Sequence, residues 1–130
     1  MDLIELGIER WHAYVENHDP AALDGMIAED CVFHSPAVHT PQAGKSITIK
    51  YLTAAMTVLK QPDFRYVGEW RAERSAVLEF KLSIDGIQID GVDIITWGED
   101  GLITEFKVMM RPLKALNTIL PLMGARLTAA

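Results

Sequence analysis

A single carboxylate interrupts an apolar strand face in the segment "DGIQIDGVDIITWGEDG", residues 85–101. Alternate residues of a strand point to the same side of a sheet. The row that starts at residue 87 consists of Ile87, Ile89, Gly91, Asp93, Ile95 and Trp97. A carboxylate buried among neighbours such as Leu78 and Phe80 loses hydration, which raises its pKa. A protonated Asp93 can donate a hydrogen bond to a developing oxyanion, so this residue is the leading catalytic candidate.

Two other interpretations of Asp93 stay open at this point. In the first, the carboxylate is a structural acceptor that is satisfied by the indole of Trp11, by a tyrosine or by a trapped water. In the second, a bulge at Gly91 shifts the register and turns Asp93 outward, since Val92 and Ile94 are apolar as well. The interpretations differ in where the carboxylate points and in what it contacts.

The segment "CVFHSP" supplies the second group of candidates. Alternation sends Phe33 and Ser35 inward and His34 to the opposite face. His34 is a candidate general base if the strand twists before Pro36, because its ordinary pKa of about 6.5 suits proton transfer. The alternative is a histidine that packs and hydrogen-bonds locally. Ser35 has no adjacent base, so we expect it to contact a ligand and not to act as a nucleophile.

Metal and cofactor chemistry find little support in the residue pattern. His34 and His39 are five residues apart across a proline-bounded loop, which is not an established ligand spacing, and no cluster of cysteines or carboxylates completes a set. Cys31 starts a strand among apolar neighbours, without a basic partner nearby, so we expect a buried and inert thiol. The sequence therefore predicts neither a metal nor a cofactor.

Aromatic and methionine side chains are expected to supply the rest of a ligand pocket. Trp11 and Tyr51 are predicted to contact a ligand, and an indole N–H or a phenol O–H is the group best suited to satisfy Asp93. Methionines such as Met56 provide an adaptable wall. The complete set of predicted pocket residues is Trp11, Tyr14, Ser35, Tyr51, Met56, Leu78, Phe80, Phe106, Val108 and Met110.

Four helices are expected to position these groups. The first, over residues 2–17, has apolar residues at helical spacing, namely Ile4, Ile8, Trp11 and Val15. Asp19 as N-cap and Pro20 as first residue predict a short second helix that ends near residue 27. A third helix runs from Gly44 to about Lys60. The last is predicted to be bent or broken near Pro121, and its apolar face consists of Leu113, Leu116, Leu120, Met123 and Leu127.

The strands are read from alternation between apolar and polar residues. A brief strand covers "CVFHSP", and four more follow the third helix, beginning with "FRYVGEWR". The clearest is "SAVLEFKLSID", which buries Ala76, Leu78, Phe80, Leu82 and Ile84. The last strand is predicted to place one row inward, namely Leu102, Thr104, Phe106, Val108 and Met110. Turns at "DG" and "GEDG" join the final three strands into an antiparallel meander.

Composition limits the class of protein and of ligand. The chain has 130 residues, 49% of them hydrophobic, which fits one globular domain over residues 1–130. A net charge of −6 argues against nucleic-acid and anionic-membrane partners. No apolar run reaches membrane-spanning length, and the acidic N-terminus lacks the basic flank of a signal peptide. With one cysteine, these features predict a cytoplasmic protein.

The order of elements resembles the nuclear transport factor 2-like superfamily, the cystatin-like α+β cone that includes ketosteroid isomerases, SnoaL-like polyketide cyclases and limonene epoxide hydrolases. The resemblance covers nearly the whole chain. It is carried by "ERWHAYVENHDPAALDGMIAEDCVFHSP", "GKSITIKYL", "GVDIITWGEDGLI" and "VMMRPLKAL". The segments "RPLKAL" and "HSPAVHTPQ" look most like an uncharacterised SnoaL-like subgroup. The resemblance implies a deep apolar pocket enclosed by a curved sheet and helices.

The resemblance also assigns positions to three residues. The helix-1 tyrosine of the isomerases, an oxyanion donor, falls on Trp11, and their general-base aspartate falls on Ser35. Their second oxyanion donor, a protonated aspartic acid, falls on Asp93. The pocket carboxylate that cyclases and epoxide hydrolases carry in the last strand is absent, since this chain has Phe106 and Val108 there.

These observations predict an α+β fold in which three N-terminal helices pack on a highly curved antiparallel sheet and a C-terminal helix closes the structure. Two functional hypotheses remain open. One is a pocket that binds a small apolar or weakly polar molecule, with possible cofactor-independent isomerase, cyclase or hydratase chemistry that uses Asp93 and His34. The other is a non-catalytic binding or dimerisation module. The resemblance further implies a homodimer formed through the outer face of the sheet.

Overall fold

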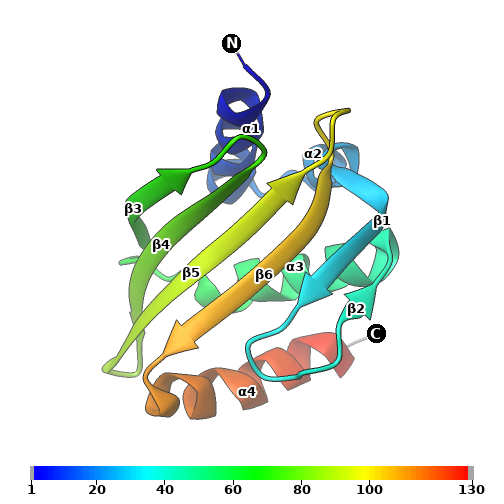
Figure 1. Ribbon diagram of the computed structural model, residues 1–130. Helices are drawn as coiled ribbons and strands as arrows, with labels where there is room; N and C mark the ends of the chain where they lie inside the picture. Colours follow the sequence, from blue (N-terminus) through cyan, green and yellow to red (C-terminus); the bar gives the residue numbers. More distant parts are fainter. Residues whose placement is uncertain (1, 129–130) are drawn as a thin grey trace.

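In the computed structural model, which describes residues 2–128, helices lie against one face of a strongly curved six-stranded sheet (Figure 1). The strand order is β2-β1-β6-β5-β4-β3. The architecture is therefore α+β, as the sequence predicts. None of the helices in the described range is long and apolar enough to cross a membrane.

Aspartates cap the first two helices, and the cap at Asp19 is the one expected from the sequence. In α1 (Leu3–Asn17), the Asp2 carboxylate accepts a hydrogen bond from the backbone N–H of Glu5 at 2.9 Å. In α2 (Pro20–Met26), the Asp19 carboxylate accepts from the N–H of Ala21 at 3.0 Å. Both contacts satisfy N–H groups that have no partner inside the helix. The third helix, α3 (Lys45–Leu59), follows Gly44, which has a φ of 116°.

The strands β3 (Arg65–Arg71), β4 (Ser75–Ile84), β5 (Ile87–Trp97) and β6 (Ile103–Arg111) form the predicted antiparallel meander. The first strand, β1 (Ile27–His34), begins four residues before the predicted start and pairs in parallel with β6. The two-residue β2 (Gln42–Ala43) pairs with its outer edge. The sheet is therefore mixed, because the β1–β6 pair is parallel whereas the other strand pairs are antiparallel.

The alternation predicted for β4 is confirmed. Its five inward residues, Ala76, Leu78, Phe80, Leu82 and Ile84, are at most 8% exposed. The β4–β5 ladder is regular from Ile87 to Thr96, so no bulge occurs at Gly91 and Asp93 points inward beside Leu78. A Cβ on Gly91 would lie 2.4 Å from the ring of Phe80, which explains the glycine in this row.

The inward row predicted for the last strand is wrong at its start. A register irregularity between Thr96 and Trp97 pairs Trp97 with Ile103 and Thr96 with Glu105. Ile103 is consequently fully buried, whereas Leu102 and Thr104 are only partly buried. Beyond the irregularity the prediction holds, and Phe106 and Val108 face the core.

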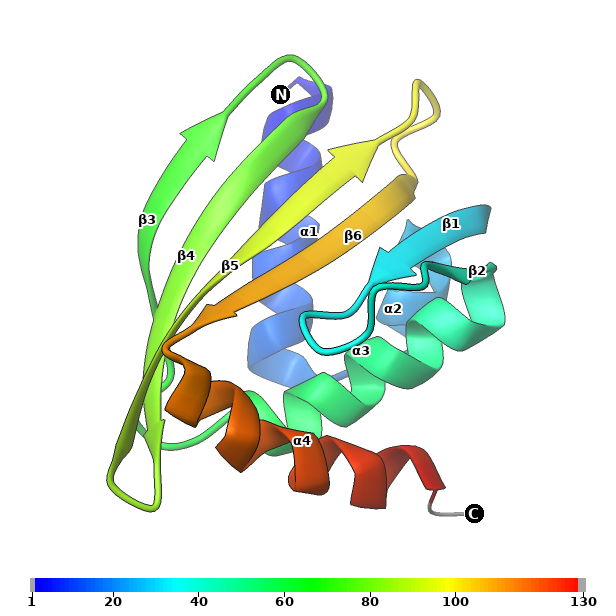
Figure 2. The same cartoon turned by 60° about the horizontal axis from the view of Figure 1, so that its bottom comes forward.

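The last helix, α4 (Leu113–Thr128), runs past the open end of the sheet and lies beside α3 (Figure 2). It continues through Pro121 without a break, contrary to one of the predicted outcomes. Its fully buried residues are Ala115 and Ile119, whereas Leu113 is 72% exposed. The predicted apolar face is therefore wrong at Leu113, whereas Leu116, Met123 and Leu127 are partly buried on the same side of the helix as Ala115 and Ile119.

Candidate functional site

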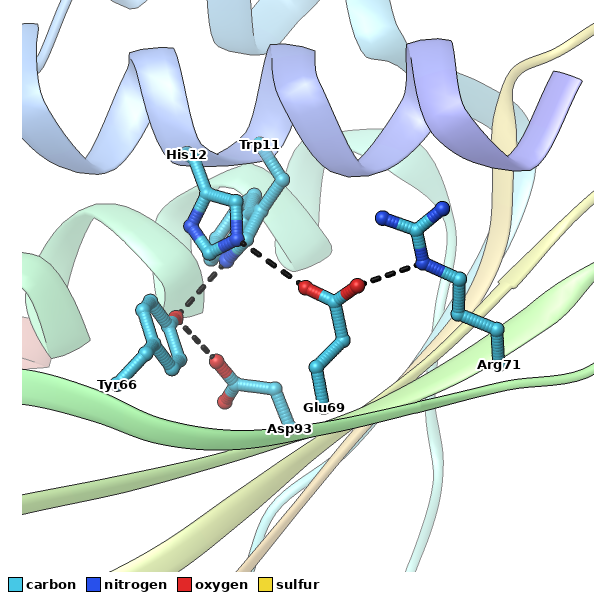
Figure 3. A network of polar contacts seen from close by, with 6 residues as sticks. All are labelled: Trp11, His12, Tyr66, Glu69, Arg71 and Asp93. Atoms are coloured by element: carbon cyan, nitrogen blue, oxygen red, sulfur yellow. Dashed lines mark hydrogen bonds and ion pairs between the residues drawn. The ribbon is translucent and has the colours of Figure 1, made fainter. Parts of the chain in front are cut away.

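The buried carboxylate of Asp93 ends a chain of hydrogen bonds that begins on α1 (Figure 3). The Trp11 Nε1–H donates to the Tyr66 hydroxyl oxygen at 2.9 Å, and the Tyr66 hydroxyl donates to Asp93 Oδ2 at 2.6 Å. An indole N–H can only donate, so Trp11 fixes the direction of the chain and leaves the phenolic hydrogen for Asp93. We call these three residues the Trp11–Tyr66–Asp93 relay.

Burial sets the proton affinity of the relay. It raises the pKa of Asp93 from 3.8 to about 7, although the hydrogen bond from Tyr66 acts in the opposite direction. Burial also raises the pKa of Tyr66 well above its ordinary value, and the neighbouring charge of Asp93 adds to the increase. Near neutral pH, Asp93 is therefore distributed between its acid and its carboxylate form, while Tyr66 remains a donor.

The strand register explains how Tyr66 reaches this position. Tyr66 pairs with Phe80, and a register irregularity between Tyr66 and Gly68 follows it. The rings of Tyr66 and Phe80 meet nearly at right angles, with their centroids 6.2 Å apart. Phe80 in turn lies over Gly91, where the absence of a side chain provides its space. Tyr66 is thus held between α1 and β5 by packing as well as by hydrogen bonds.

A second group of polar residues covers the relay between α1 and β3 (Figure 3). Arg71 Nε donates to Glu69 Oε2 at 2.6 Å, and Glu69 Oε1 lies 3.6 Å from His12 Nε2. The ring of His12 contacts Tyr66 edge-on, with centroids 5.1 Å apart. These three side chains remain 31–42% exposed, so they lie between the relay and solvent.

An apolar cavity of about 230 Å³ lies apart from the relay, between β1, α3, β6 and α4. Its lining includes four of the predicted pocket residues, Ser35, Tyr51, Val108 and Met110. The side chains of the described wall residues are uncharged, and among them only those of Ser35 and Tyr51 carry a polar group; the others are Phe33, Pro36, Ala37, Val38, Ala55, Leu59, Leu116, Ile119, Leu120, Met123, Leu127 and, without a side chain, Gly124.

Aromatic rings fill the space between this cavity and the relay. The ring of Tyr51 stacks on that of Phe33, with the ring centroids 5.1 Å apart. The corresponding centroid distances are 6.2 Å from Phe33 to Phe106 and 4.8 Å from Phe106 to Trp11. The other predicted pocket residues, Trp11, Tyr14, Met56, Leu78, Phe80 and Phe106, are core residues that do not line the cavity. Asp93 does not line it either, although its partner across the β5–β6 ladder, Val108, does.

His34 faces away from both the cavity and the relay. It occupies the outer face of the sheet, where its Nε2 lies 3.8 Å from Glu105 Oε1. Ser35 points inward, and its Oγ accepts a hydrogen bond from the N–H of Ala37 at 3.1 Å. Cys31 is fully buried, and burial raises the pKa of its thiol to about 11. Among residues 2–128, no group of three or more histidine, cysteine or carboxylate side chains is arranged to hold a metal ion.

Tyr66 is the functional candidate that sequence reasoning missed. The strand "FRYVGEWR" lacks clean alternation because Val67 lies at the irregularity, so the inward position of Tyr66 is hidden. The available signal was chemical: a buried Asp93 requires a donor, and a tyrosine was one of the groups expected to supply it.

Two solved structures share this fold and about a third of the aligned residues. A steroid delta-isomerase from Pseudomonas aeruginosa is 32% identical, with a TM-score of 0.91 over 98% of this chain and 93% of that one. An uncharacterised protein with a cystatin-like fold from Silicibacter pomeroyi DSS-3 is 30% identical, with a TM-score of 0.83 over 92% and 84% of the two chains.

A more distant structure shows the fold alone. It is a candidate SnoaL-like polyketide cyclase from Shewanella denitrificans OS-217, 17% identical with a TM-score of 0.66 over 90% of this chain and 96% of that one. A search of curated proteins found no significant match. Residues 8–106 match the family model of the SnoaL-like domain. Because this match spans most of the chain, from α1 to the middle of β6, the chain belongs to the SnoaL-like family, within the nuclear transport factor 2-like fold.

Proposed function

We propose that this protein binds a small, largely apolar molecule in the cavity between β1, α3, β6 and α4. The observation that carries the proposal is the cavity wall, where the side chains of residues 2–128 are uncharged and offer only the hydroxyls of Ser35 and Tyr51 as polar groups. Such a site favours a ligand through burial of apolar surface, with two groups available to orient it.

The volume of the cavity limits the size of this ligand. Pockets for drug-sized ligands have volumes of roughly 300–1,000 Å³. The cavity here holds about 230 Å³, so a single ring or a short branched chain fits better than a four-ring steroid. The name of the Pseudomonas neighbour suggests steroid chemistry for that protein, and a cavity volume below the range for drug-sized ligands argues for a different substrate class here.

The NMR signals of methionine methyl groups report directly on whether the cavity is occupied. Met110 and Met123 line it, whereas Met26 is buried elsewhere in the core. Titration with cyclohexanone or p-cresol at millimolar concentrations should shift the methyl NMR signals of Met110 and Met123 and leave that of Met26 in place. If neither probe moves the two cavity signals, the proposal is wrong.

A filled-cavity variant and a matched control make the test specific. Ala55→Trp places an indole into the cavity wall and should abolish the shifts. Ala72→Trp adds the same side chain at an exposed position between β3 and β4 and should leave them unchanged. Equal binding by the Ala55→Trp variant would contradict the assignment of the site.

A second candidate function is cofactor-independent acid–base chemistry on a small carbonyl, enol or polyketide-like compound, with Asp93 as hydrogen-bond donor. The pKa of about 7 supports it, because a substantial fraction of Asp93 is protonated near neutral pH. The cavity, however, ends at Val108, one strand away from Asp93. Binding alone needs no rearrangement, so it is the better-supported function. Asp93→Asn should abolish turnover while leaving the fold intact if the second function holds.

We also propose a homodimer formed through the outer face of the sheet. Trp70, Val77 and Ile94 are neighbours in one cross-strand row, and Val92 lies beside them on β5. Trp70 is 58% exposed. A two-fold axis through this apolar patch would bury it against its own copy, with surrounding charges of both signs.

A further inference from the structure

A groove on the outside of the molecule adjoins the cavity. It is bordered by the loop that follows β1 and by the end of β6, and it shares Ser35, Pro36, Ala37, Val38 and Val108 with the cavity wall. The same few residues therefore separate an apolar interior from solvent. We call this group, Ser35–Val38 together with Val108, the window.

The strand pairing leaves the window without a ladder between β1 and β6. The parallel β1–β6 ladder ends with the pair His34–Lys107, whereas β6 continues to Arg111. Beyond Lys107, β6 is paired with β5 on its other side only, within the described residues. A loop and side chains, without a hydrogen-bonded ladder, thus close the cavity at this point.

The lining residues change from apolar in the cavity to basic in the groove on the other side of the window. The outer groove is lined by three nitrogen bases, His34, His39 and Lys107, and no described lining residue is a carboxylate. Glu105 Oε1 lies 3.8 Å from His34 Nε2, and Glu105 is not among the described residues that line the groove. Lys107 forms no ion pair with any described residue. In a chain of net charge −6, this groove is a place where an anion can approach.

Ser35 contributes a donor at the boundary itself. Ser35 lines both the cavity and the groove. Since its oxygen accepts the hydrogen bond from the N–H of Ala37, its own hydroxyl hydrogen remains available to a ligand.

From this juxtaposition we infer that the ligand is a small apolar carboxylate. Its ring or chain occupies the cavity, and its carboxylate passes the window to meet Ser35 and Lys107 in the groove. This inference rests on the proposed binding function and adds the ligand class and the entrance to it.

The test compares cyclohexanecarboxylate with cyclohexanecarboxamide, which has the same ring and a neutral head group. Both should shift the methyl signals of Met110 and Met123, which report on the cavity. Only the carboxylate should also shift Met109 strongly, because Met109 lines the groove. The carboxylate should bind roughly two- to fivefold more tightly, as expected for one exposed ion pair, and 0.5 M salt should remove the preference.

Two lysine variants isolate the charge. Lys107→Gln should reduce carboxylate affinity to that of the amide, while amide affinity stays unchanged. Lys81→Gln removes a lysine from β4 on the same face, outside the groove, and should keep the preference. Equal binding of the two probes to the unmodified protein, or an unchanged preference in Lys107→Gln, would overturn this inference and leave cavity binding intact. If neither probe shifts Met110 or Met123, the proposed function itself fails.

Discussion

Replacing Asp93 with asparagine should remove a pH-dependent penalty on the folded state. The pKa of this carboxyl is about 7 in the folded protein against 3.8 as its ordinary value, because burial disfavours the charged form. A raised pKa means that the folded state binds the proton more tightly than the unfolded chain. The corresponding stability is fully present below about pH 3.8 and is lost as the pH rises through about 7.

The magnitude follows from these two pKa values. A difference of about three units corresponds to about 4 kcal/mol over the whole titration, and about 2.5 kcal/mol of this falls between pH 5 and pH 8. Asparagine has nearly the same shape and can accept the hydrogen bond from Tyr66, but it does not ionise. The free energy of unfolding of Asp93→Asn, relative to the unmodified protein, should therefore rise by about 2.5 kcal/mol from pH 5 to pH 8.

Urea unfolding at four pH values, followed by the fluorescence of the buried Trp11 and Trp97, measures this difference. Subtracting the unmodified protein at each pH cancels the other titrating groups. Asp90→Asn is the matched control, since Asp90 lies on the outer side of the same strand, with Oδ2 3.6 Å from Arg111. The free energy of unfolding of this variant, relative to the unmodified protein, should change much less over the same pH range. A pH-independent or falling difference for Asp93→Asn would refute the reasoning.

Three further predictions concern the surroundings of this site and the outer sheet face. Tyr66→Phe removes the donor that lowers the pKa of Asp93, so a carboxyl ¹³C NMR titration should find that pKa above about 7, and a lower value would contradict the relay. Gly91→Ala should cost about 1–3 kcal/mol in urea unfolding because its Cβ meets a core ring at 2.4 Å, whereas Gly25→Ala, with open space around it, serves as the control. Trp70→Ser should weaken the proposed dimer in sedimentation velocity; a monomeric unmodified protein at micromolar concentration would rule that dimer out.

Local sequence patterns were sufficient to predict the structure where the environment of a residue depends on its own neighbours in sequence. The cap at Asp19 and the alternation of β4 are of this kind, since they follow from backbone hydrogen bonding and strand periodicity. The inward direction of Asp93 was predicted for the same reason, because β5 keeps an unbroken ladder with β4.

Irregular strand pairing limited the prediction of β6 and of Tyr66 from the sequence. The irregularity near Thr96 reversed the start of β6, and the one beside Val67 concealed Tyr66. Such irregularities come from the fit between strands, which no single strand encodes. The separation of the cavity from Asp93 could not be predicted from the sequence pattern either. It depends on how the rings of Phe33 and Phe106 fill the space between the cavity and the relay.

The parallel pairing of β1 with β6 has a consequence for how the protein assembles. Ile27 pairs with Ile103, 76 positions later, whereas the meander from β3 to β6 joins strands that follow one another. Closing so long a loop carries a larger entropic cost, so we expect the meander to form early and β1 to dock late. The proposed ligand cavity lies at this late junction. A bound ligand would therefore slow unfolding and leave the folding rate nearly unchanged, which gives the protein kinetic stability in the presence of its ligand.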